Sequence, residues 1–257
     1  MLKISIITPV KNGEKFIKDT IASVFSQKGD FELEYLILDG KSSDSTIDIV
    51  KSFGNKLTLI SEKDEGPAQA INKGMHLATG DILAYLNADD LYEENCLAKV
   101  AQTFTFHPEV NWLFGRCKII DSCGHEIRRE ITLYKNLLSL LGGRNLLLCE
   151  NYINQPATFW RKEFWNLTGG MSEKLRAAFD YELWLKMYKL SNPFFLRQYL
   201  AKFRRHDLSI SEKFTRIQFG EELTIAKQYG GLLHVLIHDF NRRKILFFYK
   251  LMRFCKH

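Results

Sequence analysis

The chain has 257 residues, and 46% of them are hydrophobic, which suits one large domain or one domain with a small appendage. Its formal net charge of +6 favours anionic partners, such as nucleotide diphosphates, lipid head groups or nucleic acid, without choosing among them. The five cysteines form no CxxC pair, which argues against a metal knuckle or a redox motif of that kind. The sequence has no signal peptide and no apolar run of about 20 residues, so we expect a cytoplasmic protein.

Short apolar runs alternate with amphipathic stretches through residues 1–90. The runs predict strands at residues 4–7, 36–38, 57–60 and 82–86. The stretches 16–27 and 68–77 have the apolar spacing of helices. This alternation predicts an α/β fold with a mostly parallel central sheet flanked by helices. Ligands of such sheets collect at the carboxyl ends of the strands, where this chain has acidic turns.

A different pattern follows in the second half of the chain. We expect a helix over 92–106, and then strands at 110–120 and 126–132 that pair across a turn-rich segment. The leucine-rich stretch 134–149 is interrupted by Gly142-Gly143, a pair that breaks or hinges a helix. A further helix is expected over 181–189. Three tryptophans are expected in the core and not against a sugar: Trp160, Trp165 and Trp184.

Four polar sites in this pattern have residue types that carry chemistry. Asp39 ends the second predicted strand, where a carboxylate can accept hydrogen bonds from a base or a ribose. Asn87-Ala88-Asp89-Asp90 ends the fourth and offers the oxygen ligands that a hard cation prefers. Asp180 begins an aromatic-rich helix. His206 lies in Arg204-Arg205-His206-Asp207, a basic cluster suited to phosphate.

Several short motifs stand in a fixed order along the chain. In the first part they are Ser5 to Gly13, Leu38 to Gly40, Ser43 to Thr46, Asp64 to Gly66, Ala70 to Gly74, Ala78 to Asp81 and Leu86 to Asp90. Later ones are Asn154 to Ala157, Gly169-Gly170, Asp180 to Leu185 and Arg204 to Ser211. In order and spacing they resemble the family 2 glycosyltransferases, which have the GT-A fold. The resemblance is densest up to residue 95.

The resemblance implies an α/β GT-A fold with a C-terminal helical extension. Residues 1–110 then form the half that binds the nucleotide-sugar donor, and 111–222 form the acceptor and catalytic half of the same domain. The remaining segment, 223–257, is a basic amphipathic helical tail. The activity implied is transfer of a sugar from a nucleoside-diphosphate sugar, with UDP favoured, to a hydroxyl of a saccharide or lipid-linked acceptor in cell-envelope glycan synthesis.

The resemblance also implies roles for single residues. The donor-binding set is Thr8, Pro9, Val10, Asp39, Asp64, Asn72, Asn87 and Ala88, with the first four lining the base and Asp39 hydrogen-bonding it. Asp89 matches the final acid of the family's DxD motif and would bind Mn²⁺ or Mg²⁺, with His206 beside the metal and the diphosphate. Asp180 matches the general base that takes the proton of the acceptor hydroxyl. With no second nucleophilic carboxylate required, a single in-line displacement inverts the anomeric configuration.

The sequence departs from the family pattern at two positions. Asn87 stands where the first acid of DxD is usual, which puts the tightness of metal binding in doubt. Phe179 stands where the family often has Glu, so an acid that could contact the acceptor or tune the base is missing. Asp90, next to the metal-binding acid, is expected to cap the following helix, with Glu93 as its partner in a capping box.

Three alternative functions would require different features. A nucleotidyltransferase would need a glycine-rich basic loop after the first strand, which Pro9-Val10-Lys11-Asn12-Gly13 does not provide. A non-catalytic module that binds nucleic acid or anionic lipid would present basic and aromatic residues without convergent acids. We therefore expect no nucleic acid partner. A catalytically inactive sugar-nucleotide binder would differ only in a turnover assay.

The C-terminal tail has the pattern of an amphipathic helix. Its apolar stripe consists of Leu233, Ile237, Phe240, Phe247, Leu251 and Phe254, with Arg242, Arg253 and Lys256 opposite. Such a helix can lie in an anionic membrane interface, which would suit a lipid-linked acceptor at the inner face of the cell membrane. The alternative is that the stripe packs on the catalytic domain, and the sequence leaves both open.

Overall fold

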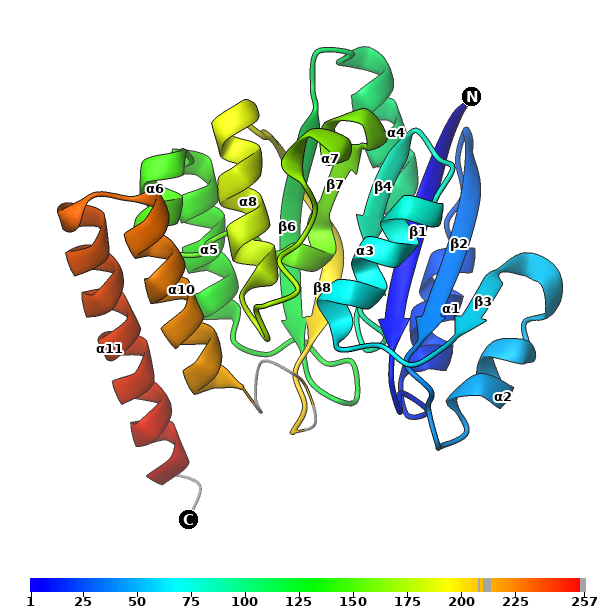
Figure 1. Cartoon of the computed structure of the whole chain (residues 1–257), viewed down its shortest axis with the longest axis horizontal. Coiled ribbons are helices and arrows are strands. Elements are labelled where there is room, and N and C mark those ends of the chain that lie inside the picture. The colour runs from blue at the N-terminus through cyan, green and yellow to red at the C-terminus, as the bar shows by residue number, and fades with distance from the viewer. Residues whose placement is uncertain (208, 210–213, 255–257) are drawn as a thin grey trace.

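The structure is a computed structural model that describes residues 1–207, 209 and 214–254, with side chains described as far as residue 246. Its centre is one eight-stranded sheet with the strand order β3-β2-β1-β4-β7-β6-β8-β5 (Figure 1). The strands are β1 Leu2–Val10, β2 Phe31–Asp39, β3 Thr58–Ser61, β4 Ile82–Tyr85, β5 Leu91–Tyr92, β6 Trp112–Ile120, β7 Thr158–Arg161 and β8 Phe194–Arg204.

The pairing of these strands confirms the predicted α/β fold with a mostly parallel sheet. β1 lies between β2 and β4, and β2 pairs with β3, all in parallel. β7 runs antiparallel to both of its neighbours, β4 and β6. β8 is parallel to β6 and antiparallel to β5. The four strands predicted in the first 90 residues are all present.

Helices cover the sheet on both faces and extend it on one side (Figure 1). They are α1 Ile17–Phe25, α2 Thr46–Lys51, α3 Pro67–Leu77, α4 Cys96–Phe106, α5 Arg129–Leu141, α6 Arg144–Cys149, α7 Lys162–Thr168, α8 Phe179–Leu190, α10 Thr215–Tyr229 and α11 Leu232–Phe254. Two short 3₁₀ turns are η1 Gly54–Lys56 and η2 Gln155–Ala157.

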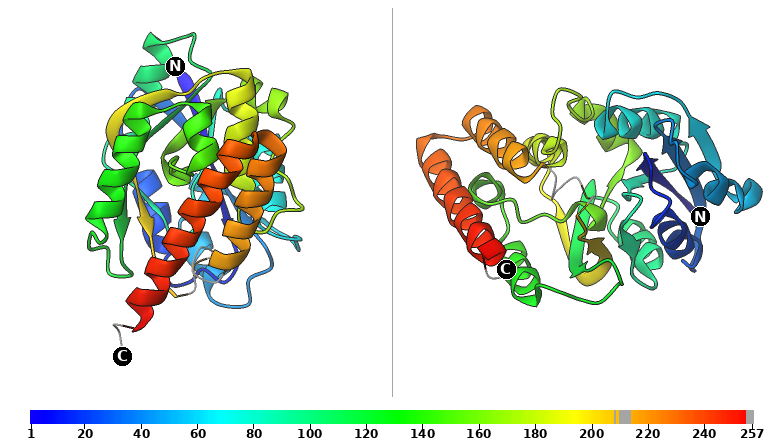
Figure 2. Two further views of the ribbon diagram at one scale, coloured as in Figure 1. Left: turned by 90° about the vertical axis from the view of Figure 1, so that its left-hand side faces the viewer. Right: turned by 90° about the horizontal axis from the view of Figure 1, so that it is seen from below.

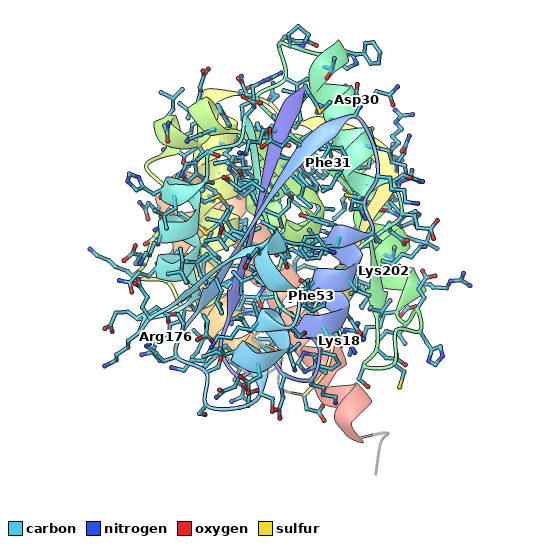
Figure 3. The ribbon with its side chains drawn as sticks, turned by 90° about the vertical axis from the view of Figure 1, so that its right-hand side faces the viewer. Lys18, Asp30, Phe31, Phe53, Arg176 and Lys202 are labelled. Carbon is cyan, nitrogen blue, oxygen red and sulfur yellow. The ribbon has the colours of Figure 1, made fainter. Side chains whose placement is uncertain are left out.

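Alternation along β1 shows how one sequence builds both layers of the core. Ile4 and Ile6 point to the face covered by α1 and α4, whereas Ile7 points to the face covered by α3 and α8. Successive side chains of a strand point to opposite faces, so the continuous apolar run of β1 is what a strand covered on both faces requires. Figure 3 views the molecule from the β3 edge, where Phe53 packs with its ring centroid 6.0 Å from that of Phe25.

The predicted core position of the three tryptophans is confirmed. Trp160 stacks on Trp165 with ring centroids 5.6 Å apart, and Trp184 stacks on Trp112 at 6.0 Å. All four are buried between the sheet and the helices α7 and α8. They fix the orientation of α8, whose first turn carries Asp180.

Two predictions in the second half of the chain were wrong in part. The predicted helix 92–106 begins only at Cys96, because Leu91 and Tyr92 form β5 and pair with β8. The predicted hairpin has its first strand in β6, but 126–132 makes a single bridge, between Glu126 and Ile120, before helix α5 begins. β6 pairs instead with β7 and β8, which come later in the chain, and the 11 residues of β8 offer the longer edge.

Helices α5, α6, α10 and α11 form a layer beyond α8, at the left of Figure 1. α5 ends at Gly142-Gly143, both with positive φ, as the glycine pair predicted. The predicted C-terminal helical extension is α10 with α11. No helix in the described part of the chain is both long and apolar enough to span a membrane.

Candidate active site

The parallel strands β1, β2 and β4 end at the lower edge of the sheet in Figure 1, and the predicted site residues follow these ends. Asp39 is the last residue of β2, and Asp89 lies in the turn after β4. Parallel strands bring loops that are distant in sequence to one edge, as the sequence analysis expected.

A cavity of about 330 Å³ lies beside the end of β2. Its lining residues are Leu38, Asp39, Ile60, Glu62, Asp64, Gln69, Ala70 and Lys73. Asp39, predicted to bind the base, and Asp64, predicted to bind the donor, therefore share one pocket. Ser61 donates its hydroxyl to Asp39 Oδ2 at 2.6 Å, and the Ser42 N–H lies 3.2 Å from both carboxylate oxygens of Asp39. Burial raises the pKa of Asp64, and a hydrogen bond from the Gly66 N–H offsets part of this rise.

The loops after β1 and β2 brace each other beside this cavity. Asn12 Oδ1 accepts the Ser43 N–H at 2.8 Å, and Ser42 Oγ accepts the Asn12 N–H at 2.8 Å. Asn12 and Lys41 both have positive φ, at 55° and 59°, which costs about 1–3 kcal/mol for a non-glycine residue. This cross-bracing holds the strained conformations, so the loops are shaped before any ligand arrives.

The remaining predicted donor residues differ in what they contact. Thr8 is buried, and its hydroxyl lies 3.0 Å from Tyr35 Oη. Pro9 and Val10 end β1 in register with Leu38 and Asp39, beside the cavity. Asn72 points elsewhere, because its side chain bonds the backbone of Met171 in both directions at 2.9 Å.

The turn after β4 carries the predicted metal ligand. Asp89 Oδ2 lies 2.8 Å from His206 Nε2, although the two residues are 117 positions apart in sequence. The His206 ring packs against Phe16, with centroids 4.6 Å apart. The structure therefore brings together the two residues predicted to lie at the metal, and Phe16 holds the imidazole in place.

The residues around Asp89 serve to hold its turn. Asn87 donates its amide to Asp90 Oδ2 at 3.1 Å and to Gln155 Oε1 at 3.0 Å. Ala88, between Asn87 and Asp89 in the sequence, is partly buried. Asp90 was predicted to cap the next helix, and this is wrong: it is fully buried and accepts the Arg204 N–H at 2.8 Å. Burial raises the pKa of Asp90 well above its usual value, and the neighbouring charge of Asp89 adds to this.

Arg204 was predicted to belong to a phosphate-binding cluster, but its guanidinium is used inside the protein. Its Nε donates to the Asp89 carbonyl at 2.9 Å, and one Nη donates to the Ser122 carbonyl at 3.1 Å. The guanidinium carbon lies 4.7 Å from the centre of the Phe16 ring. Arg204 thus braces the turn that presents Asp89, a role that no local signal in the sequence indicates.

The donor set at Asp89 fits a divalent cation. Mg²⁺ in enzymes that act on phosphates is usually held by one or two carboxylates together with the phosphates and water. Asp89 and His206 converge with an oxygen and a nitrogen ligand, and both side chains are partly accessible. Asn87 adds no carboxylate, so the protein itself would supply these two ligands.

Asp180 lies in the first turn of α8, partly buried, and accepts the Tyr181 N–H at 2.7 Å. Loss of hydration raises the pKa of Asp180 to about 7, and the charge of Glu222 adds to the rise. Burial likewise raises the pKa of Tyr85 at the end of β4, and the charges of both Asp180 and Asp90 act on it. The predicted base therefore lies near the strand end that carries the Asp89 turn.

Three ionisable residues around Asp180 were missed in the sequence. Glu222 of α10 is buried and accepts the Asn151 amide at 3.2 Å, and burial raises its pKa. Lys135 of α5 lowers the pKa of Asp180 and donates to Asn154 Oδ1 at 3.3 Å. Burial raises the pKa of Glu150, and the charge of Lys135 acts in the opposite direction. Glu222 and Lys135 lie on helices, and Glu150 directly follows α6, in places that no local motif revealed.

Solved structures share this fold. The chain matches Staphylococcus aureus TarS 1–349 in complex with UDP-GlcNAc with a TM-score of 0.67 and 20% identity, over 87% of this chain and 66% of that one. It matches the mannosyltransferase PcManGT from Pyrobaculum calidifontis, in complex with GDP-Man and Mn²⁺, with a TM-score of 0.66 and 18% identity, over 91% and 69%. The fold is that of the GT-A glycosyltransferases.

The sequence comparisons agree. The chain is 26% identical to an uncharacterized glycosyltransferase of Rickettsia typhi over 96% of its own length and 80% of that protein. It is 29% identical to a PGL/p-HBAD biosynthesis glycosyltransferase of Mycobacterium tuberculosis over 76% and 73%. The family model described as glycosyl transferase family 2 matches residues 5–167, more than half of the chain. The protein belongs to this family and is a glycosyltransferase.

Proposed function

We propose that the protein transfers a sugar from a nucleoside-diphosphate sugar, with UDP as the first choice of nucleotide, to an acceptor hydroxyl with inversion at the anomeric carbon. The observation that carries this proposal is the contact between Asp89 and His206. It stands at the same sheet edge as the cavity with Asp39 and Asp64. Family membership does not favour the alternative of a non-catalytic nucleic-acid or lipid-binding module.

In this proposal the donor lies along the edge from the cavity to the Asp89 turn. The base enters the cavity, where Asp39 accepts a hydrogen bond from it and Asp64 faces the nucleotide. Thr8, Pro9, Val10, Asn72, Asn87 and Ala88 remain predicted donor contacts, of which Asn72 is already engaged by Met171. Asp89 and His206 would hold Mn²⁺ or Mg²⁺, which when bound neutralises charge on the departing diphosphate.

Asp180 acts as the general base. Its carboxylate takes the proton of the acceptor hydroxyl while that oxygen forms a bond to the anomeric carbon. The bond from the anomeric carbon to the diphosphate breaks, and its electron pair leaves with the diphosphate oxygen. A pKa of about 7 suits a base that works near neutral pH, because it combines basicity with a useful ionised fraction.

The acceptor proposed is a saccharide or a lipid-linked glycan in cell-envelope synthesis, reached from the cytoplasm at the inner face of the membrane. The similarity to a protein described as acting in PGL/p-HBAD biosynthesis supports an acceptor of this kind. In this proposal residues 1–110 bind the donor, residues 111–222 bind the acceptor and carry out catalysis, and the tail, 223–257, has a separate role. Peripheral contact with an anionic membrane belongs to this proposal.

A donor screen tests it. Thermal unfolding is followed with UDP-, GDP- and dTDP-sugars, each with Mn²⁺ and each with a chelator. We expect a UDP-sugar with Mn²⁺ to raise the Tm, since a ligand that binds only the native state stabilises it by mass action. If none of these donors with either Mn²⁺ or Mg²⁺ raises the Tm at millimolar concentration, the donor site is wrongly assigned. A shift of labelled RNA or DNA in a gel would support the rejected alternative.

A further inference from the structure

Helix α5 has its polarity reversed relative to a helix that covers a protein core. Its outward side chains are Leu133, Tyr134, Leu137, Leu140 and Leu141, and Leu133, Leu137 and Leu141 are 64%, 56% and 70% exposed. The side that faces the protein carries Thr132, Asn136 and Ser139, all buried, together with Leu138. A surface helix of a soluble protein normally buries its leucines and exposes its polar residues, so the outer face of α5 calls for an apolar partner.

The inner polar side of α5 faces the catalytic half of the site. Lys135 donates to Asn154 Oδ1 at 3.3 Å, and its charge acts on Asp180. Asn136 donates to Tyr199 Oη at 3.1 Å. The helix therefore separates the region of the base from the outer apolar surface, with one face turned to each.

Helix α11 presents a second apolar stripe. It docks on the domain through His238, whose Nδ1 lies 3.0 Å from the Leu148 carbonyl, and through Asn241, which donates to the Cys149 carbonyl. The side chains turned away from this contact are Leu232, Leu233, Leu236, Ile237 and Phe240, all exposed. Leu233, Ile237 and Phe240 of the predicted stripe thus do not pack on the domain, while Phe247, Leu251, Phe254 and the charges at Arg253 and Lys256 lie outside the described side chains.

The two helices lie on one side of the molecule. Both face the viewer in the left panel of Figure 2, and the view from below shows the lower end of α11 next to α5. Lys244 of α11 lies 6.0 Å from the ring centre of Tyr134 of α5, which confirms that the helices meet. We call the outward residues of both helices the apolar face: Leu133, Tyr134, Leu137, Leu140 and Leu141 of α5 with Leu233, Leu236, Ile237 and Phe240 of α11.

Charge decides which partner this face fits. Residues 232–257 contain six Lys or Arg and one Asp, a net +5 out of the +6 of the whole chain. Arg243 and Lys244 are exposed on α11, and Arg243 also pairs with Asp239 at 2.8 Å, so the net charge of the segment and not one free cation favours an anionic partner. Two copies of the chain that met through this face would bring two such cationic segments together, which is unfavourable. An anionic lipid surface offers opposite charge and an apolar interior at once.

We propose that the apolar face of α5 and α11 docks on an anionic phospholipid bilayer and turns the polar inner side of α5, with the Asp180 region behind it, toward lipid-linked acceptors. The inference rests on the proposed function, since it names the kind of surface that delivers the acceptor. It assigns α5 a membrane contact that the pattern of the tail did not indicate. Leucines of α5 enter the acyl boundary, and the cations of α11 contact the lipid head groups.

Vesicle flotation of the full chain tests this. Wild type is mixed with vesicles of phosphatidylcholine alone or of phosphatidylcholine with phosphatidylglycerol, and binding is expected only to the second. L133S/L137S in α5 and L233S/F240S in α11 are each expected to lower the partition coefficient ~10-fold or more, because apolar insertion drives the binding. R243Q/K244Q should weaken it ~5-fold for each charge removed and should make it less sensitive to salt.

The matched control is L167S/F106S, which changes two side chains of α7 and α4 that are 71% and 70% exposed and lie away from the apolar face. It should bind like the wild type. All variants are compared by Tm and by sedimentation velocity. The proposal is wrong if wild type does not float with anionic vesicles, or if the α5 variant with a normal Tm keeps its binding. It is also wrong if these variants change only self-association, which would make a second copy the partner.

The α5 variant carries the decisive result, since loss of binding in the α11 variant alone would reduce the contact to the tail. The donor screen separates this proposal from the proposed function. Stabilisation by a UDP-sugar with Mn²⁺ without vesicle binding overturns only the membrane contact. Vesicle binding without any donor effect overturns the donor site and leaves the docking face.

Discussion

The ionisation of Asp180 sets the pH range in which the enzyme is expected to work. Burial raises the pKa of Asp180 to about 7, and the base is active only when ionised. We therefore expect kcat/KM for transfer to fall about tenfold for each pH unit below 7 and to level off above it. The measurement is a rate profile between pH 5 and pH 9 at saturating Mn²⁺. A flat profile down to pH 5 would mean that Asp180 does not titrate in the step observed.

Asp180→Asn keeps the shape of the side chain but cannot accept a proton. Transfer should fall ~10²–10⁴-fold, as expected for loss of a general base, while donor binding stays nearly unchanged. The matched control is Glu182→Gln, since Glu182 is two residues away and is paired with Lys186 at 3.2 Å. If Asp180→Asn retains a near-normal rate with the true acceptor, then Glu182 or another acid is the base.

The same substitution has an effect on stability with a definite sign. Because the pKa of Asp180 is higher in the folded chain than in the unfolded one, folding favours the protonated form and stability is lost as pH rises through about 7. At pH 8, Asp180→Asn should therefore raise the Tm by a few degrees, since ~1 kcal/mol shifts Tm by roughly 2–4 °C in a domain of this size. At pH 4 the difference should nearly vanish. A lower Tm of Asp180→Asn at pH 8 would contradict the raised pKa of Asp180.

At the scale of elements, the close approach of the loops after β2 and β3 shapes the cavity proposed to bind the base. A Cβ atom at Gly40 would stand 2.5 Å from Asp64 Oδ2, so this position leaves no room for a side chain unless Asp64 moves. We expect Gly40→Ala to displace Asp64 and weaken nucleotide binding ~10-fold, a loss of about 1.4 kcal/mol. Calorimetric titration with UDP measures this.

Gly54→Ala is a useful comparison. Gly54 has a positive φ, so the substitution is expected to destabilise the folded state. It lies in η1, with open space around the added methyl. It should lower the Tm without changing the affinity of the folded protein for UDP. Equal UDP affinity in Gly40→Ala and the wild type would show that the base does not occupy this cavity.

The elements that the sequence predicted correctly are those with strong local signals. The buried strands ending near Val10 and Asp39, and the glycine pair after α5, could be recognised from period and turn chemistry alone. The prediction of a hairpin at 110–132 failed because β6 pairs with β7 and β8, whose residues come up to 84 positions later. A turn signal is local and carries no information about such distant partners. The core position of the tryptophans needed only their size.

Within the site, the family resemblance was needed to predict which residues bind donor and metal. The contacts among them follow from the fold, because the partners are far apart in sequence. Nothing local joins Asp89 to His206, and their contact exists because β8 delivers His206 beside the end of β4. Asp90 was misread as a cap because its real partner, Arg204, is 114 residues away. The reversed polarity of α5 could not be read either, since a leucine stripe in sequence does not say which way it faces.

At the scale of the whole molecule, donor and metal should stabilise the chain together. Asp89→Ala removes the carboxylate of the proposed metal site, so the Tm gain from UDP with Mn²⁺ over UDP alone should vanish, and turnover should fall at least ~10²-fold. His206→Ala should have the same direction of effect. Differential scanning fluorimetry with and without a chelator measures both. A full metal-dependent gain in Asp89→Ala would place the metal elsewhere.

The position of β8 between β6 and β5 has a consequence for how the enzyme is made. β6 ends at Ile120 and β8 begins only at Phe194, so the strand between β6 and β5 is missing while the intervening segment is synthesised. Asp89 acquires both His206 and the Arg204 brace only when the last quarter of the chain has been synthesised. In the proposed function, a chain truncated before β8 would keep the cavity beside Asp39 but would lack His206 and the Arg204 brace of Asp89, so we expect it to bind a nucleotide base without catalysing transfer.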